Sequence, residues 1–111
     1  MKLETLCEKL PVKLIIGNPK IDFCGVYAGD FVSRVVSREV AGKLWITVMN
    51  NINVIAAASL AGMPAVLIAE DVVFFKDALE AAEKYNIAVL SSKLGEYELC
   101  AGISRIFSEG T

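Results

Sequence analysis

Hydrophobic positions in the second half of the chain alternate between two spacings. Short continuous apolar runs are typical of strands that are buried on both faces. The segments that follow them carry apolar residues every three or four positions, as on one face of a helix. The runs lie at residues 44–49, 65–69 and 87–90, and the helical segments at about 54–61, 75–85 and 95–107. Three such repeats predict a parallel sheet whose strands are joined by right-handed crossover helices.

The first half of the chain has shorter and less regular patterns. Apolar spacing over residues 3–10 predicts a helix that Pro11 ends. Strands are predicted at 12–16 and 21–27, on either side of a Gly-Asn-Pro turn. Asp30 then stands where it can cap a short helix. We therefore expect a small α/β protein with a mostly parallel sheet flanked by helices.

Length and composition fit one domain that buries much apolar surface. The chain has 111 residues and no linker, low-complexity tract or clear repeat, so residues 1–111 are expected to fold as a single domain. The hydrophobic fraction of 55% and the mean hydropathy of +0.54 are high for a soluble domain. A large core explains this excess, and so does an apolar surface buried against another subunit. We favour both together, which predicts a homodimer.

The sequence has no pattern for membrane insertion or secretion. The longest apolar stretch, residues 52–69, is interrupted by Asn53, Ser59 and Pro64 and is not predicted to span a membrane. Residues 1–10 include two glutamates and lack the pattern of a signal peptide. The net charge is −2, and acids and bases are spread along the chain, which argues against binding to nucleic acid or to an anionic membrane surface. A cytoplasmic location is expected.

Catalytic and metal-binding patterns are missing. Cys7, Cys24 and Cys100 are an odd, widely spaced set without a CxxC pair, so buried reduced thiols are expected rather than disulfides. Because there are no histidines, no metal site is predicted, and no serine or cysteine has a histidine base to activate it. The sequence also lacks GxGxxG and GxxxxGK(S/T). We expect no cofactor and no enzymatic activity.

Polar residues follow each of the three predicted strands of the second half. In an open parallel sheet, ligands bind beyond the carboxyl ends of the strands. The candidate ligand-binding residues are Thr47, Asn50, Asn51, Ser91 and Ser92, with Glu70, Asp71 and Lys93 at the same ends. Hydroxyl and amide groups beside a helix N-terminus can hold an anion or a small polar metabolite. Helix capping explains the same residues, and the sequence leaves both interpretations open.

The apolar run at residues 72–75 exceeds what one helix face requires. Phe75 continues the face formed by Ala78 and Leu79, and Phe74 would be rotated by about 100° from it on a helix. A large aromatic side chain left in water there would favour aggregation. We therefore predict that Val73 and Phe74 lie at or beside a self-association surface.

Several stretches of the sequence resemble the DRTGG domain. The resemblance rests on residues 41–47 (AGKLWIT), 53–58 (NVIAAA) and 63–68 (MPAVLI), and it extends to 25–30 (GVYAGD) and 87–90 (IAVL), so that it covers essentially the whole chain. It implies an α/β domain with a regulatory role and no established catalytic activity. Such domains accompany CBS domains, occur in some phosphate acetyltransferases, and are similar to the N-terminal domain of HPr kinase/phosphorylase.

The chain departs from the residues that give this family its name. The Asp-Arg pair falls at Asn50 and Asn51, and the Thr-Gly-Gly falls near Ala69, Glu70 and Asp71. If those positions bind a ligand in relatives, an anion is disfavoured here, because a cationic arginine is absent and two acids are present.

The sequence thus favours a non-catalytic regulatory or interaction module, homodimeric and acting on a partner protein. The alternative is a domain that binds a small molecule, such as a nucleotide or an acyl-phosphate-like metabolite, at the carboxyl ends of the parallel strands. Catalysis would need groups completed across a subunit interface, for instance Asp30 facing Glu70 of a neighbouring copy.

Overall fold

One five-stranded sheet organises the part of the chain that the structure, a computed structural model, describes: residues 1–36 and 39–109. Its elements are α1 (Leu3–Lys9), β1 (Val12–Ile16), β2 (Val26–Ala28), α2 (Val32–Val35), β3 (Leu44–Thr47), α3 (Ile52–Ala61), β4 (Ala65–Ile68), α4 (Lys76–Lys84), β5 (Ala88–Ser92) and α5 (Glu96–Glu109). The predicted class, α/β with a mostly parallel sheet between helices, is confirmed. No helix in the described residues is long and apolar enough to cross a membrane.

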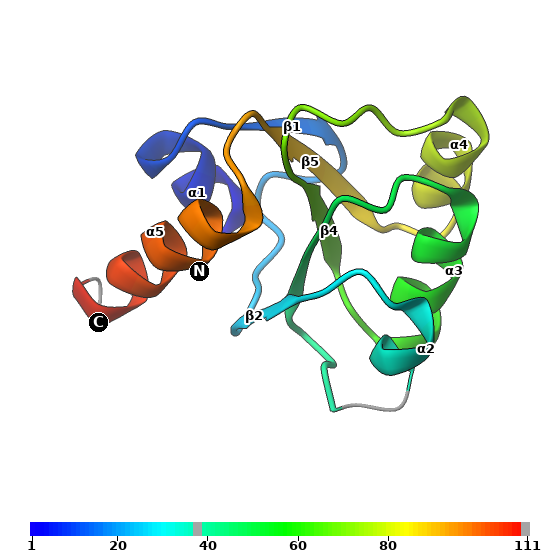
Figure 1. Cartoon of the computed structure of the whole chain (residues 1–111), viewed down its shortest axis with the longest axis horizontal. Helices are drawn as coiled ribbons and strands as arrows, with labels where there is room; N and C mark the ends of the chain where they lie inside the picture. The colour runs from blue at the N-terminus through cyan, green and yellow to red at the C-terminus, as the bar shows by residue number, and fades with distance from the viewer. Residues whose placement is uncertain (37–38, 110–111) are drawn as a thin grey trace.

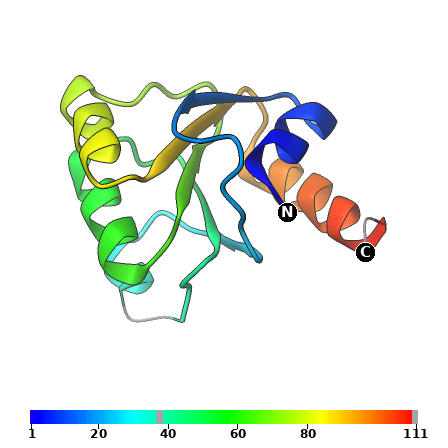
Figure 2. The same ribbon diagram turned by 180° about the vertical axis from the view of Figure 1, so that it is seen from behind.

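The strand order is β1-β5-β4-β3-β2, with β2 to β5 parallel and β1 antiparallel to β5. Each crossover from β2 to β5 therefore moves one strand in the same direction. Helices α2, α3 and α4 lie together on one face of the sheet, while α1 and α5 lie together on the other (Figures 1 and 2). Because the strand order never reverses among the parallel strands, the sheet lacks the switch point at which doubly wound folds open a ligand crevice.

The central strands are buried along their whole length. All four residues of β3 and all four of β4 are buried. Trp45 and Val66 face the layer of α2, α3 and α4, whereas Leu44, Ile46 and Leu67 face α1 and α5. This alternation explains why the sequence of these strands is a continuous apolar run rather than an alternating one.

Helix α3 has an asparagine N-cap and a glycine C-cap, two residue types that favour helix ends. The side chain of Asn51 accepts a hydrogen bond of 2.9 Å from the backbone N–H of Asn53, which caps the first turn. Gly62 ends the helix in the left-handed conformation, with φ of 75°.

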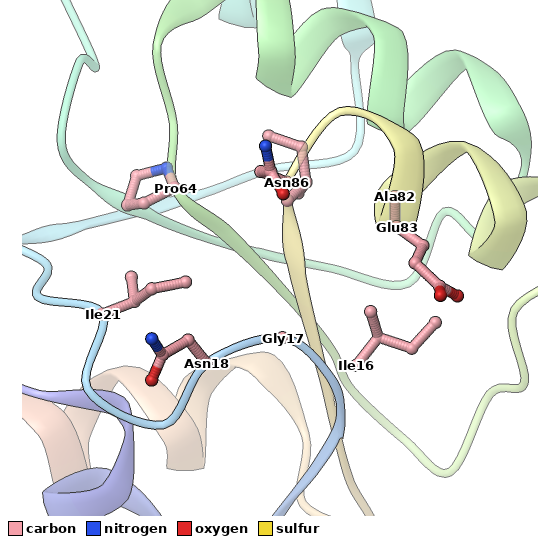
Figure 3. A pocket seen from close by; sticks show the side chains of 9 residues that line it. Ile16, Gly17, Asn18, Ile21, Pro64, Ala82, Glu83 and Asn86 are labelled. Atoms are coloured by element: carbon pink, nitrogen blue, oxygen red, sulfur yellow. The ribbon is translucent and has the colours of Figure 1, made fainter.

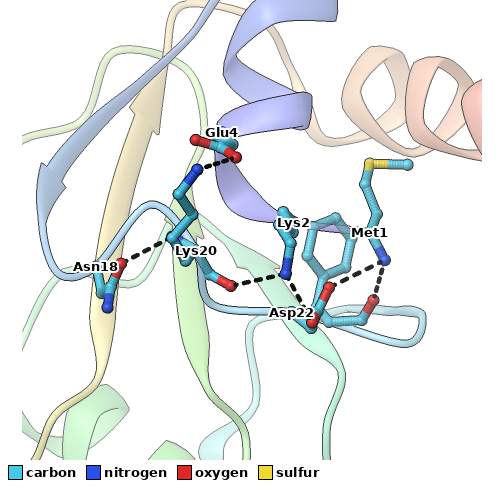
Figure 4. A network of polar contacts seen from close by, with 7 residues as sticks. Met1, Lys2, Glu4, Asn18, Lys20 and Asp22 are labelled. Atoms are coloured by element: carbon cyan, nitrogen blue, oxygen red, sulfur yellow. Dashed lines mark hydrogen bonds and ion pairs between the residues drawn. The ribbon is translucent and has the colours of Figure 1, made fainter.

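The strand predicted at residues 21–27 is wrong in length, since β2 contains only Val26–Ala28. Contacts with α1 hold the preceding segment instead (Figure 4): Lys20 Nζ lies 2.8 Å from Glu4 Oε1, and Lys2 Nζ lies 3.3 Å from Asp22 Oδ2. Phe23 is buried and meets the Phe107 ring edge-to-face, with 5.8 Å between centroids. The apolar side chains of this segment thus serve as anchors for α1 and α5 rather than as a strand.

The predicted orientation of the apolar run before α4 is also wrong. Phe74 is 6% exposed and belongs to the core, whereas Val73 is 76% and Phe75 58% exposed. The helix begins only at Lys76, and Phe75 has extended backbone with φ of −68° and ψ of 152°. The rotation of about 100° per residue that holds on a helix therefore does not apply to these residues. Phe74 is a core residue, and an interface role for Val73 stays a prediction.

Replacing each of the two phenylalanines, Phe74 and Phe75, with alanine tests which of the two rings is buried. Phe74→Ala should lower the free energy of unfolding by about 3–5 kcal/mol, because it leaves a cavity in the packed layer. Phe75→Ala removes an exposed ring and should change stability by about 0.5 kcal/mol or less. Urea unfolding followed by circular dichroism measures both. Equal effects of the two substitutions would contradict the orientation described here.

Candidate functional site

A hydrogen-bond network lies at the carboxyl ends of β2 and β3. Oδ1 of Asp30 accepts hydrogen bonds from the Thr47 hydroxyl at 2.8 Å and from the Val48 backbone N–H at 3.1 Å. The Thr47 oxygen in turn accepts from the Met49 backbone N–H at 3.1 Å, and Thr47 itself is fully buried. Asp30 therefore ties the end of β2 to the end of β3, and it does not cap α2, whose N-cap is Phe31.

Glu96 adds a further acid beside Asp30, and Glu70 lies within electrostatic range of Glu96. The side chain of Glu96, in the first turn of α5, lies close enough to Asp30 to share a hydrogen bond with it when Glu96 is protonated. The pKa of Glu96 is raised to about 7. Burial is the largest cause, followed by the charge of Asp30 and this hydrogen bond, and then by the charge of Glu70. Asp30 and Glu70 thus both raise the pKa of Glu96 within one chain, without a neighbouring subunit.

The backbone after β4 brings Glu70 to this network. Glu70 and Asp71 both adopt the left-handed conformation, with φ of 58° and 60°. Their N–H groups donate 2.8 Å hydrogen bonds to the carbonyl oxygens of Leu94 and Ser92, respectively. The β4–α4 connection is thereby fastened to the β5–α5 connection. The described residues contain no group of three or more His, Cys, Asp or Glu side chains with metal-site geometry, and the gathered negative charge disfavours an anion at this network.

Four of the five predicted ligand-binding residues make contacts within the chain. Thr47 holds Asp30, Asn51 caps α3, and the Asn50 side-chain amide donates to the Val73 carbonyl at 2.7 Å. The buried Ser92 hydroxyl donates to the Pro11 carbonyl at 2.9 Å and accepts from the Leu94 N–H at 3.1 Å. Ser91 is half-buried and lines two surface depressions. The structure does not gather these five side chains at one site, and ligand binding by them stays a prediction.

The depressions beside Ser91 lie where β5 meets β1. One is a cleft of about 510 Å³ that contains Lys13, Asp71, Ser92 and Lys93. The other is a hollow of about 130 Å³ with mostly apolar walls. Sequence reasoning missed Lys13, because only the antiparallel pairing of Lys13 with Ser91 brings it to the carboxyl end of β5.

Two larger depressions lie elsewhere. A cavity of about 650 Å³ lies at the opposite edge of the sheet, before β4 and β5, between Pro64 and Asn86 on one side and Gly17 and Asn18 on the other (Figure 3). A groove of about 560 Å³ runs between α2 and α3. Its lining includes the exposed apolar residues Phe31, Val36 and Leu60 together with Asp30, Asn51 and Asn53.

Two of the three cysteines are held in an unreactive form in this arrangement. All three are free thiols; Cys7 and Cys100 are half-buried, whereas Cys24 is exposed, contrary to the expectation that all are buried. Burial raises the pKa of the thiols of Cys7 and Cys100, and the charge of Glu96 adds to the shift at Cys100. Both thiols are therefore kept in the protonated, weakly nucleophilic form.

Comparisons with known proteins bear on the fold. No protein-family model and no curated protein matches the chain. A solved structure is similar over 92% of this chain, with a TM-score of 0.76 and 13% sequence identity. It contains the CBS and DRTGG domains of the regulatory region of Clostridium perfringens pyrophosphatase, complexed with the activator diadenosine tetraphosphate.

That likeness shows the fold. The match spans 45% of the chain in that structure, so this sequence corresponds to less than half of the regulatory region solved there. The α/β architecture expected from the DRTGG resemblance thus has a counterpart in a regulatory region that includes a DRTGG domain.

The acidic network should make stability depend on pH. The pKa of Glu96 is raised to about 7 from 4.5, so its protonation stabilises the folded state. This stability is fully present below pH 4.5 and is lost as the pH rises through about 7. Thermal unfolding of the wild type between pH 5.5 and pH 8 should therefore show a lower midpoint at pH 8.

Glu96→Gln isolates this effect. The amide cannot ionise and should keep a higher unfolding midpoint than the wild type at pH 8, with a flatter dependence on pH. Glu98→Gln, which alters a nearby glutamate that caps the Gly95 N–H at 3.0 Å, serves as the control and should retain the wild-type slope. An unchanged pH profile in Glu96→Gln would contradict the assignment.

Proposed function

We propose that this chain is a cytoplasmic, non-catalytic regulatory module of the DRTGG type, that residues 1–111 form one domain, and that the domain self-associates to act on a partner protein. The observation that carries this proposal is the apolar groove between α2 and α3, flanked by large exposed side chains. Apolar side chains gathered on one surface are typical of association surfaces.

The backbone after β4 supports the family assignment. As placed on this sequence, the family's Thr-Gly-Gly falls near Ala69, Glu70 and Asp71. Glu70 and Asp71 have φ of 58° and 60°, a conformation that glycine adopts without steric cost and that other residues rarely adopt. Two consecutive left-handed residues at this point fit a turn that the family's motif would form with glycines.

A regulatory rather than a catalytic role is supported by the state of the reactive groups. The thiols of Cys7 and Cys100 have raised pKa values. The hydroxyls of Thr47 and Ser92 are buried in hydrogen bonds within the chain. The similar solved structure is itself from a regulatory region. The two hydroxyls stabilise connections between elements, as expected for a scaffold that changes its contacts and not its covalent chemistry.

A second copy of the chain is the partner that we propose for the groove. The accessible surface of the described residues is 6087 Å², and a standard interface of about 800 Å² per partner would cover about one-eighth of it. A two-fold contact uses the same patch on both copies, so one apolar groove is enough to form it. Phe31 and Leu60, 71% and 81% exposed, are the side chains that gain most from such burial.

The alternative function is small-molecule binding at the carboxyl edge of the sheet. It is favoured by one observation, the pair of adjoining depressions beside Ser91. The nucleotide activator of the similar regulatory region belongs to the class of ligand that we propose for this alternative.

Light scattering after size exclusion tests self-association at micromolar concentration. The wild type should elute with twice the monomer mass of 12.0 kDa. Leu60→Gln should shift it toward monomer, with at least about tenfold weaker association, because it places an amide in the contact. Tyr97→Gln is the matched control, since Tyr97 is 83% exposed on α5, away from the groove.

The two variants also decide where the interface lies. Wild-type protein that remains monomeric would refute self-association. A dimer that survives Leu60→Gln but is weakened by Tyr97→Gln would place the interface on α5 and refute the groove. Circular dichroism of both variants checks that the fold is kept.

A further inference from the structure

The edge strand β1 carries a bulge where it pairs with β5. Leu14 pairs with Leu90 and Ile16 with Val89, so Ile15 is the extra residue between two consecutive pairs. Ile15 is 41% exposed, and it lies on the rim of both depressions at this corner of the sheet. Bulges at sheet edges often redirect a side chain beside a binding site.

The two depressions at this corner adjoin each other. Ile15, Asp71 and Ser91 line both of them. The remaining walls of the hollow are Ile68, Val72, Val73, Phe74, Leu79 and Val89, all apolar. The cleft, by contrast, contains two lysines. A continuous surface therefore offers an apolar recess of about 130 Å³ at one end and positive charge in a cleft of about 510 Å³ at the other.

The charges of the cleft come from three elements. Lys13 lies on β1 and pairs with Ser91, two residues before Lys93, which directly follows β5. Asp71, after β4, is the acid that lines the same cleft. Within residues 1–36 and 39–109, neither of these lysines forms an ion pair, whereas Lys2 and Lys20 do. The positive charge is thus available at the corner, away from the network of Asp30, Glu70 and Glu96.

We infer that this corner binds a small phosphate monoester that carries an apolar or planar ring, with the phosphate between Lys13 and Lys93 and the ring in the hollow bounded by Phe74 and Val89. Lysine binds phosphate as a point charge. Asp71 stands between the two parts and accepts a hydrogen bond from a ligand hydroxyl or amino group. The inference deepens the small-molecule alternative proposed above and rests on it.

The two parts of the site should contribute differently. The lysines are exposed, so their attraction for phosphate is screened by salt and weakens as ionic strength rises. The ring contributes binding free energy by leaving water for the hollow, and this contribution does not change with salt at moderate ionic strength. A ligand with both groups should bind more tightly than either group alone, because the second contact is made without a second loss of translational freedom.

Three probes separate these contributions: adenosine monophosphate, adenosine and inorganic phosphate. Each is titrated into the ¹⁵N-labelled chain, with backbone amide shifts as the readout. Adenosine monophosphate should shift the amides of Ile15, Val73 and Ser91, and it should bind at least about tenfold more tightly than either of the other probes. Raising the sodium chloride concentration from about 50 to 300 mM should weaken the binding of adenosine monophosphate and leave the binding of adenosine unchanged.

A double substitution, Lys13→Gln with Lys93→Gln, tests the charged part. The double substitution should weaken the binding of adenosine monophosphate by about tenfold or more and leave the binding of adenosine unchanged. Lys43→Gln is the control, because it also removes a positive charge, and Lys43 directly precedes β3 at the opposite end of the strands and does not line the cleft.

The possible outcomes distinguish failure of this site from failure of the alternative function. Monophosphate binding that the double substitution does not weaken would overturn the role of the lysines. Shifts confined to other residues, such as those of the α2–α3 groove, would overturn this site while small-molecule binding stands. No shift with any of the three probes at millimolar concentration would overturn both the site and the alternative function.

Discussion

Burial of β3 and β4 on both faces is the constraint on which the rest of the structure depends. Their eight residues are all buried, and alternate side chains face opposite layers. Right-handed crossovers that move in one direction place all of their helices on one face. The other face must therefore be covered from outside the strand–helix repeats. Helices α1 and α5 do this, and Leu3, Leu6, Leu99 and Ile103 are fully or almost fully buried there.

This topology also determines how the polar residues at the strand ends are used. Without a reversal of strand order there is no crevice between parallel strands for those residues to line. Thr47 and Ser92 instead become buried, and each hydroxyl both donates and accepts a hydrogen bond within the chain. Such fully satisfied groups stabilise the connections between elements. Two accessible surfaces remain at the carboxyl ends of the strands: the groove between α2 and α3, and the corner where β1 joins antiparallel to β5.

The turn after β4 places two adjacent acids in different surroundings at the carboxyl ends of the strands. Glu70 and Asp71 are adjacent in sequence, yet the charge of Glu70 raises the pKa of Glu96, whereas Asp71 lines the cleft beside Lys93. Both backbone N–H groups are hydrogen-bonded to the β5–α5 connection, which fixes the turn in its left-handed conformation. One strained turn thus supplies one acid beside Glu96 and another to a basic corner, and it connects the two regions through the backbone.

Sequence patterns by themselves determined the class of the fold, the parallel strands and the ends of α3. These features follow from local rules, namely apolar periodicity, an asparagine N-cap and a glycine C-cap, which act over a few residues. Tertiary structure decided the rest. Phe74 and Phe75 have the same side chain, and only the extended backbone before α4 decides which one is buried. Asp30 was expected to cap the next helix, but β3 brings Thr47 and Val48 to its carboxylate. Lys13 reaches Ser91 through strand pairing across most of the chain. Such contacts depend on how distant elements pack, which no local pattern encodes.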